Sequence, residues 1–192
     1  MKKSVLFLGY DKKTTSLINF LIKKNCTVLQ FGQKNLSTKI LEKNFDIIIC
    51  FGYKKIIKKK VLNFLNRPII NLHISYLPYN RGSHPNFWSF IENTPKGVSI
   101  HEINERIDSG NLILRKRINF KKIENHTFNS TYEILIREIE NLFKKNYSKL
   151  IYNKYKIIKF KERGTYHSKK QLPKSLNSWN VKILDYLKFY FK

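Results

Sequence analysis

Acidic residues are scarce in this chain of 192 residues: 13 Asp and Glu stand against 38 Lys and Arg, a formal net charge of +25. A field of this sign attracts phosphorylated ligands, nucleic acids and acidic membranes. The lysines are spread along the whole chain and accompany many Asn and Ile residues, rather than gathering in one tail or stripe. We therefore interpret the charge as a compositional bias, and nucleic acid is not the expected partner.

Cysteine is rare as well. The chain has only Cys26 and Cys50, with no C-x-x-C pair and no Cys/His cluster at zinc-site spacing. A disulfide between the two stays open, but both lie in or beside apolar segments, which favours reduced, partly buried thiols. We expect no metal site.

Long hydrophobic runs are missing. No apolar stretch approaches the roughly 20 residues that span a bilayer. Residues 1–8 resemble a signal peptide only briefly, because the apolar run ends at Gly9 and meets Asp11 without a small-residue cleavage site. We read this segment as the first strand of a cytoplasmic protein, with no membrane partner.

What is present is an alternation of apolar runs and helical patterns, in a chain with 42% hydrophobic residues, enough for one well-buried core. We expect strands at 4–8, 27–31, 46–51 and 68–74, with helices at 14–24, 36–43 and 54–66 between them. This order predicts an α/β fold with a mostly parallel sheet and helices on both faces.

The character changes after residue 74. We expect a loop at 75–85, a short helix at 87–92, strands at 96–103 and 112–120, a long amphipathic helix at 131–150, a strand at 155–160 and a final helix from about residue 180. Residues 1–150 then form one domain, and residues 151–192 a short extension packed on it.

Three polar residues stand out near the end of the fourth strand. Asn71 and His73 are two apart, so their side chains share a face, at the sheet edge where open α/β proteins bind ligands. Asp108 lies in a tight turn from which its carboxylate can reach the same crevice. An amide and an imidazole can stabilise an oxyanion, while a carboxylate can hold the histidine or take a proton from an amine. Each residue alone also has an ordinary role: strand cap, core histidine or turn former.

No Gly-x-Ser-x-Gly elbow or paired Cys/His indicates a covalent intermediate, so direct attack by an external amine fits acyl transfer better. The segment 71–83 (NLHISYLPYNRGS), with 97–101 (GVSIH) and 107–110 (IDSG), closely resembles the motifs of folate-dependent formyltransferases. The match is strongest over residues 68–118. The resemblance implies a Rossmann-like catalytic domain, 10-formyltetrahydrofolate as donor, and Asn71, His73 and Asp108 as the catalytic trio.

The resemblance also suggests binding residues. The expected cofactor-binding residues are Phe51, Gly52, Tyr53, Ile57, Arg106 and Ile107. The expected substrate-binding residues are Ser75, Arg81, Ser99, His101, Tyr166 and Lys169. Purely structural roles remain as alternatives. For Arg81 the favoured role is to hold a loop by hydrogen bonds to backbone carbonyl groups. Ser75, Ser99 and His101 can simply line the site, and the loop 164–170 can be a solvated turn. Asn104 stands where the family often has an acidic residue, so the resemblance does not fix the details of the folate contacts.

The family that the sequence resembles includes methionyl-tRNA formyltransferase, glycinamide ribonucleotide formyltransferase and the sugar-nucleotide N-formyltransferases. Methionyl-tRNA formyltransferase has a sizeable C-terminal domain that grips tRNA, for which the stretch after the motifs is too short. The segments 81–88 and 164–170 look more like the sugar-modifying members, so we expect a nucleotide-linked amino sugar, specifically a dTDP-4-amino-4,6-dideoxysugar of surface glycan or O-antigen biosynthesis. Glycinamide ribonucleotide formyltransferase of purine synthesis is the alternative. A non-catalytic folate- or nucleic-acid-binding protein is the alternative of another class, and a homodimer is left open.

Overall fold

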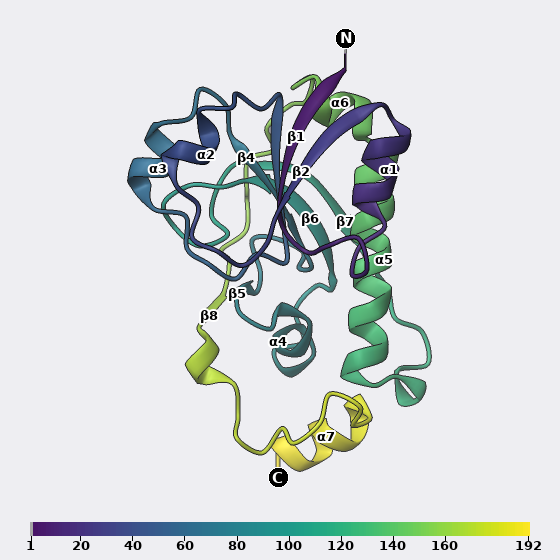
Figure 1. The fold of residues 1–192 in the computed structure, drawn as a ribbon. Helices are drawn as coiled ribbons and strands as arrows, with labels where there is room; N and C mark the ends of the chain where they lie inside the picture. The colour runs from purple at the N-terminus through teal and green to yellow at the C-terminus, as the bar shows by residue number, and fades with distance from the viewer. Residues whose placement is uncertain (1) are drawn as a thin grey trace.

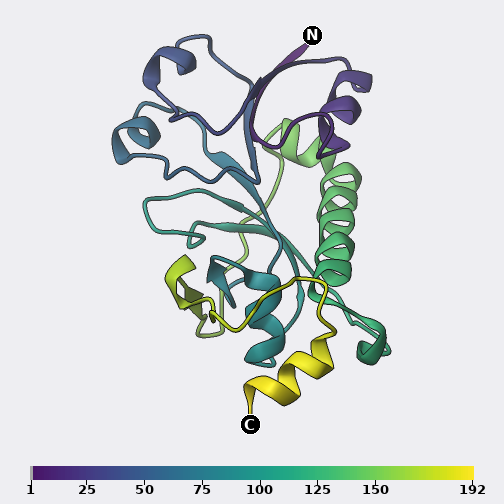
Figure 2. The same ribbon diagram turned by 60° about the horizontal axis from the view of Figure 1, so that its bottom comes forward.

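The computed structural model describes residues 2–192 and contains a six-stranded sheet in the order β2-β1-β3-β4-β6-β7 (Figures 1 and 2). The strands are β1 (Lys3–Gly9), β2 (Cys26–Phe31), β3 (Ile47–Phe51), β4 (Ile69–His73), β6 (Gly97–Glu102) and β7 (Leu112–Arg117). The first four pair in parallel, whereas β6 pairs antiparallel with both β4 and β7. The mostly parallel sheet predicted from the sequence is confirmed.

Helices cover both faces of this sheet, also as predicted (Figure 1). Because side chains alternate along a strand, Val5 and Phe7 face one layer and Leu6 and Leu8 face the other. The first layer contains α1 (Leu17–Lys23), α5 (Phe128–Lys145) and α6 (Tyr147–Ile151). The second contains α2 (Thr38–Leu41) and α3 (Lys59–Asn63). The central strands β1 and β3 are therefore buried on both faces, which explains their continuous apolar sequences.

A third apolar cluster joins the C-terminal residues to the middle of the chain. Its buried members come from α4 (Pro85–Ile91), the start of α5 and α7 (Ile183–Tyr190): Phe87, Trp88, Phe90, Phe128, Ile183 and Tyr186. The short helices η1 (Ile123–Asn125) and η2 (Lys169–Gln171) lie in the connections. A two-stranded ladder of β5 (Arg81–Gly82) and β8 (Tyr166–His167) adds a second attachment of the tail.

The helices of the second layer are shorter than predicted. The helix expected at 54–66 is α3, only five residues long, and the one expected at 36–43 is α2, with four. Neither has a side-chain cap, and each buries one residue of its helical turn, Leu41 or Val61. Short helices in water need a packed face, and these have little to bury.

One predicted strand is wrong, and two predicted loops each contain a short strand. In the segment 155–160 only Ile158 pairs, through a bridge to Leu112. Ile157 and Ile158 are both exposed, so neither face of this segment is buried against the core as a strand's apolar face would be. In contrast, the predicted loops 75–85 and 164–170 supply β5 and β8, whose pairing depends on partners more than 80 residues apart.

The two cysteines are free thiols, because Cys26 faces the α1 layer and Cys50 the α3 layer, on opposite faces of the sheet. Across residues 2–192 no helix is both long and apolar enough to cross a membrane. The same residues contain no cluster of three or more His, Cys, Asp or Glu side chains that could hold a metal ion.

The third cluster should contribute strongly to stability. Phe128 is fully buried, with its ring centroid 5.1 Å from that of Phe87 and 5.7 Å from that of Tyr186. We expect Phe128→Ala to lower the free energy of unfolding by about 3–5 kcal/mol, through lost burial and the cavity left behind. Phe191→Ala is the control, because Phe191 is 67% exposed. Chemical denaturation measures both; equal effects would contradict the packing described.

Candidate active site

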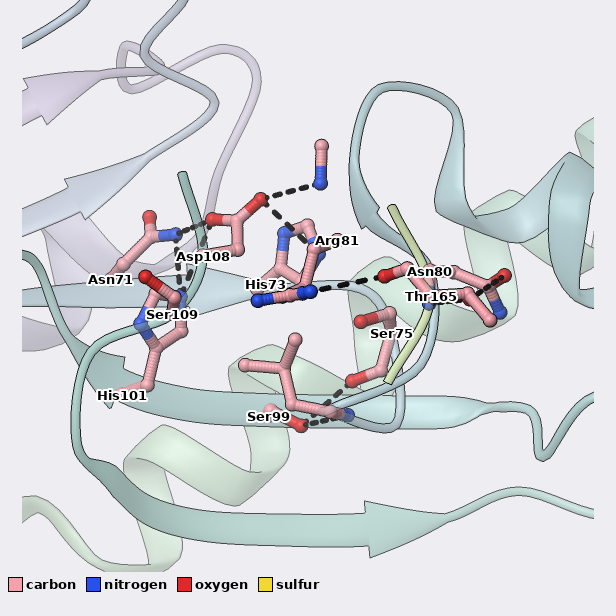
Figure 3. A network of polar contacts seen from close by, with 12 residues as sticks. Asn71, His73, Ser75, Asn80, Arg81, Ser99, His101, Asp108, Ser109 and Thr165 are labelled. Atoms are coloured by element: carbon pink, nitrogen blue, oxygen red, sulfur yellow. Dashed lines mark hydrogen bonds and ion pairs between the residues drawn. The ribbon is translucent and has the colours of Figure 1, made fainter. Parts of the chain in front are cut away.

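The predicted polar residues meet where the sheet changes from parallel to antiparallel pairing. In the register of β4 and β6, Asn71 lies opposite His101, and His73 lies opposite Ser99. All four therefore belong to one face of the sheet, as the spacing of Asn71 and His73 predicts. Figure 3 shows Asp108 reaching over this face from the loop between β6 and β7.

The backbone around Asp108 is built to deliver its carboxylate. Asp108 adopts the left-handed conformation, with φ of 47°, which Asp and Asn tolerate better than most residues. Two residues later, a Cβ on Gly110 would lie 1.9 Å from the carbonyl oxygen of Glu102. Only glycine allows the loop to return this close to β6, so the Asp-Ser-Gly sequence has a steric cause.

Two hydrogen bonds fix the Asp108 carboxylate. Its Oδ1 accepts from Asn71 Nδ2 at 3.2 Å, and its Oδ2 accepts from the backbone N–H of Gly82 at 2.9 Å. Burial would raise the pKa of this carboxyl, but the nearby His73 and His101 and the Gly82 N–H together hold it well below its usual range. Asp108 is therefore ionised at neutral pH.

His73 is buried with one ring nitrogen uncommitted. Its Nδ1 faces the backbone carbonyl of Asn80, as Figure 3 shows, which makes Nδ1 the protonated nitrogen. Its Nε2 lies 3.6 Å from Asp108 Oδ2, beyond hydrogen-bond distance, and has no hydrogen-bond partner in residues 2–192. Burial lowers the pKa of His73, although the Asp108 charge opposes this. The neutral ring thus presents a lone pair beside the carboxylate.

His101 orients the amide of Asn71 from behind. Its Nδ1 lies 2.7 Å from the carbonyl oxygen of Glu102 and must carry the proton, so its Nε2 accepts from Asn71 Nδ2 at 3.0 Å. The same Nε2 lies 3.5 Å from Asp108 Oδ1. His101 is only 1% exposed. Its position supports the trio rather than lining open space.

The two predicted serines differ in what their hydroxyl groups do. The Ser99 hydroxyl accepts from the N–H of Leu77 at 3.0 Å and donates to the carbonyl oxygen of Ser75 at 2.7 Å. It is fully buried and ties the loop after β4 to β6. The Ser75 hydroxyl is buried without a hydrogen-bond partner within residues 2–192. Ser75 therefore keeps a free polar atom near the end of β4, whereas Ser99 does not.

A pocket of ≈ 210 Å³ opens beside Asp108 and brings together residues predicted for two different ligands. It is lined by Arg81, Arg106, Ile107 and Tyr166. Arg81 also holds a loop in place, the role favoured for it from the sequence, since its Nε donates to the carbonyl oxygen of Thr165 at 3.3 Å. The structure places Lys169 elsewhere: it is exposed near His84, whose pKa is lowered by burial and by the Lys169 charge.

The segment after β3, predicted to contact the cofactor, divides between two faces. The Phe51 side chain packs in the core against Tyr10, with ring centroids 4.8 Å apart, on the face away from Asn71. Gly52 adopts a φ of +68° beneath the Tyr10 ring. The Tyr53 hydroxyl donates to the Lys34 carbonyl oxygen at 2.6 Å, and Ile57 is buried among the residues of the α3 layer. Of these, Gly52 and Tyr53 border the carboxyl edge of the sheet.

Sequence reasoning missed the groups that hold the trio in place. Gly82 supplies the N–H for Asp108 and has a φ of +90°; a Cβ there would lie 2.2 Å from the carbonyl oxygen of His167. Thr165 accepts a hydrogen bond from the N–H of Asn80 at 2.8 Å. The Arg-Gly dipeptide was a visible sign of a special backbone position, but its partner strand was not.

The site as a whole combines an amide donor, a neutral imidazole and an ionised carboxylate at one point, next to a pocket with two guanidinium groups. It lacks a serine or cysteine nucleophile held by a base among these residues. The arrangement suits stabilisation of a carbonyl oxygen and removal of a proton from an attacking nucleophile.

Comparison with known proteins agrees with this geometry. The sequence matches the formyl transferase family over residues 4–142. The fold superposes with a TM-score of 0.85 on a crystal structure of the formyltransferase PseJ from Anoxybacillus kamchatkensis, in complex with UDP-4,6-dideoxy-4-formamido-L-AltNAc and tetrahydrofolate. The two sequences are 36% identical, and the alignment covers 94% of this chain and 96% of that one.

Two other likenesses are more limited. A sugar N-formyltransferase from a Shewanella species shares the fold, with a TM-score of 0.76 at 23% identity over 88% of this chain and 77% of that one. A methionyl-tRNA formyltransferase of Buchnera aphidicola is 35% identical over 113 residues, which are 56% of this chain and 36% of that protein. The chain thus matches only about a third of the length of these curated relatives.

The protonation state of His73 can be measured directly. We expect its imidazole to titrate below 6.5 in NMR spectra, because burial disfavours the charged form, and Asp108→Asn to lower its pKa further by removing the opposing charge. The resonance is assigned by its loss in His73→Gln.

The lowered pKa of His73 also makes the stability of the fold depend on pH. The unfolded chain then binds the proton more readily, so this contribution is present above pH 6.5 and is lost as pH falls through the lower, folded-state pKa. Titration above 6.5 would show instead that His73 is an imidazolium near neutrality.

Proposed function

The chain belongs to the formyl transferase family, and on that premise we propose that it is an enzyme that transfers a formyl group from 10-formyltetrahydrofolate to the amine of a nucleotide-linked amino sugar. The observation that carries the proposal is the meeting of Asn71, His73 and Asp108 at one edge of the sheet, beside a pocket with two arginines. We also propose that residues 1–150 form the catalytic domain and 151–192 an extension that packs on it through β8 and α7.

The residues present fit a formyl donor. The His73 Nε2 atom is buried and has no hydrogen-bond partner within residues 2–192, although it faces an ionised carboxylate. A buried polar atom without a partner is costly unless a ligand or water completes its hydrogen bonds. The folate supplies an activated formyl group. Gly52, Tyr53 and Ile57, from the segment that follows β3, are the residues we propose to border it.

Each member of the trio then has a defined task. Asn71 donates one amide hydrogen to His101, which fixes the amide; the other, on the longer bond to Asp108, can be shared with negative charge developing on the formyl oxygen. His73 Nε2 accepts the proton from the attacking amine, and the Asp108 carboxylate stabilises the imidazolium that results. The same proton can then return to the departing nitrogen.

The sugar substrate is supported by the relative that matches most of both chains. PseJ of Anoxybacillus kamchatkensis was crystallised with a UDP-linked 4-formamido sugar. We propose a nucleotide-linked 4-amino sugar for this chain as well. That relative supports a uridine nucleotide, whereas the sequence resemblance favoured dTDP. The fold likeness to other sugar N-formyltransferases fits the same class but does not select the nucleotide.

Substituting Asp108→Asn should lower turnover about 10²–10⁴-fold, because the imidazolium loses its counter-charge. Asn tolerates the left-handed backbone at this position, so the fold and tetrahydrofolate binding should persist. Release of tetrahydrofolate measures the rate, and circular dichroism the fold. Asp185→Asn is the matched control, an exposed aspartate on α7. Turnover unchanged in Asp108→Asn would exclude this mechanism.

The substrate class can be tested with four amines in parallel: a UDP-4-amino sugar, a dTDP-4-amino sugar, glycinamide ribonucleotide and methionyl-tRNA. We expect turnover with the nucleotide sugars only, because the relative that matches both chains nearly end to end carries a nucleotide sugar. Formylation of glycinamide ribonucleotide or methionyl-tRNA alone would replace the proposed substrate class. The absence of transfer to every amine, with intact folate binding, would favour a non-catalytic folate-binding protein.

A further inference from the structure

The pocket beside Asp108 brings Arg106 and Ile107, expected to contact the folate, into one cavity with Arg81 and Tyr166, expected to contact the substrate. One cavity of ≈ 210 Å³ cannot readily serve both ligands. We infer that this pocket binds the nucleoside diphosphate of the amino-sugar substrate, with Arg81 and Arg106 on the phosphates and Tyr166 on the nucleoside. This inference rests on the proposed function and reassigns Arg106 and Ile107 from folate to substrate.

The two guanidinium groups have unused donors. Arg106 makes no side-chain hydrogen bond or ion pair in the part of the chain described, residues 2–192; its backbone N–H alone donates, to Asn104 Oδ1 at 3.0 Å. Arg81 uses Nε for Thr165, which leaves the two terminal nitrogens of its fork. By contrast, Arg115 is committed to Glu162 at 3.0 Å and to the Leu77 carbonyl oxygen at 2.8 Å. Arg81 and Arg106 therefore bring unused guanidinium donors together in one pocket.

Phosphate is the ligand chemistry that such a pair suits. Two like charges lining one cavity repel each other, and an anion between them relieves the repulsion. A guanidinium fork binds phosphate oxygens through two parallel hydrogen bonds, which a single lysine cannot do. The other anion available in the proposed reaction is the carboxylate tail of the folate. The residues that border the carboxyl edge of β3, Gly52 and Tyr53, do not line this pocket, which favours the diphosphate.

Tyr166 offers an aromatic surface in the same cavity. Its side chain rests against Gly82, where a Cβ would come within 2.9 Å of Tyr166 Cε2, yet the residue is 46% exposed. An exposed aromatic ring held in place by a glycine is a stacking platform for a base or ribose. Because β8 pairs with β5, the C-terminal segment fixes this ring next to the arginines.

The pocket lies at the correct place relative to the trio. Arg81 directly precedes Gly82, whose N–H binds Asp108, and Arg106 lies two residues before Asp108 in the same loop. A diphosphate held by both arginines would therefore lie next to the Asp108 carboxylate and the neighbouring His73 Nε2. A sugar that joins the diphosphate to an amine can bridge this distance.

The test is equilibrium binding of UDP, inorganic diphosphate and tetrahydrofolate to the full chain, measured by calorimetry. We expect Arg81→Gln and Arg106→Gln each to weaken UDP and diphosphate binding about 10- to 100-fold, and to leave tetrahydrofolate affinity within about twofold. Arg137→Gln is the control: it removes one charge from an exposed position on α5, which covers the opposite face of the sheet. Tyr166→Leu should weaken UDP but not diphosphate.

The outcomes separate the two proposals. Loss of tetrahydrofolate binding in the Arg81 and Arg106 variants would assign the pocket to the folate tail and overturn the inference. Equal losses in Arg137→Gln would show only the general field of a basic protein, and unchanged UDP binding in all variants would also overturn it. dTDP is titrated into the unaltered chain as well; if that chain binds neither UDP nor dTDP while it binds tetrahydrofolate, the proposed nucleotide-sugar substrate itself fails. Equal loss of UDP and diphosphate in Tyr166→Leu would remove the stacking role.

Discussion

Two donors from β4 and β5, the Asn71 amide and the Gly82 N–H, hydrogen-bond to the Asp108 carboxylate, and the rings of His73 and His101 lie beside it. A buried carboxylate is costly unless such groups compensate its lost hydration. Satisfying it therefore requires the loop after β4, the turn at Gly110 and the antiparallel pairing of β4 with β6 to be in place together. The local structure of the site follows largely from that one requirement.

The position of the site also follows from the topology of the sheet. Two parallel pairings place the carboxyl ends of β1, β3 and β4 at one edge, and the antiparallel β6 then brings His101 and Ser99 back alongside Asn71 and His73. A purely parallel neighbour would have directed its own loop to that edge instead. The reversal at β6 lets the Asp108 loop fold over the face of the sheet, so catalytic groups come from neighbouring strands and not from distant domains.

Much of this arrangement could be predicted from residues alone. The shared face of Asn71 and His73 followed from strand periodicity, and the turn at Asp108 from its Asp-Ser-Gly sequence. The contacts of Gly82 and Thr165 could not be predicted, because β5 and β8 have two residues each and no periodic pattern. The family resemblance predicts Phe51 among the cofactor contacts, whereas alternation along β3 turns its side chain into the core. Short-range patterns identify faces, whereas partners far apart in sequence depend on the assembled fold.

The ladder between β5 and β8 has a consequence for how the protein is made. Its two strands are separated by more than 80 residues, so their pairing closes a long loop and carries the entropy cost of doing so. Contacts between distant segments form slowly, and a chain emerging from the ribosome cannot form this one until residue 167 has been synthesised. The sheet with Asn71 and His73 can assemble earlier, but Tyr166 joins the pocket only after the chain has been synthesised past residue 167. A nascent chain therefore acquires its catalytic groups before it acquires the full wall that surrounds them.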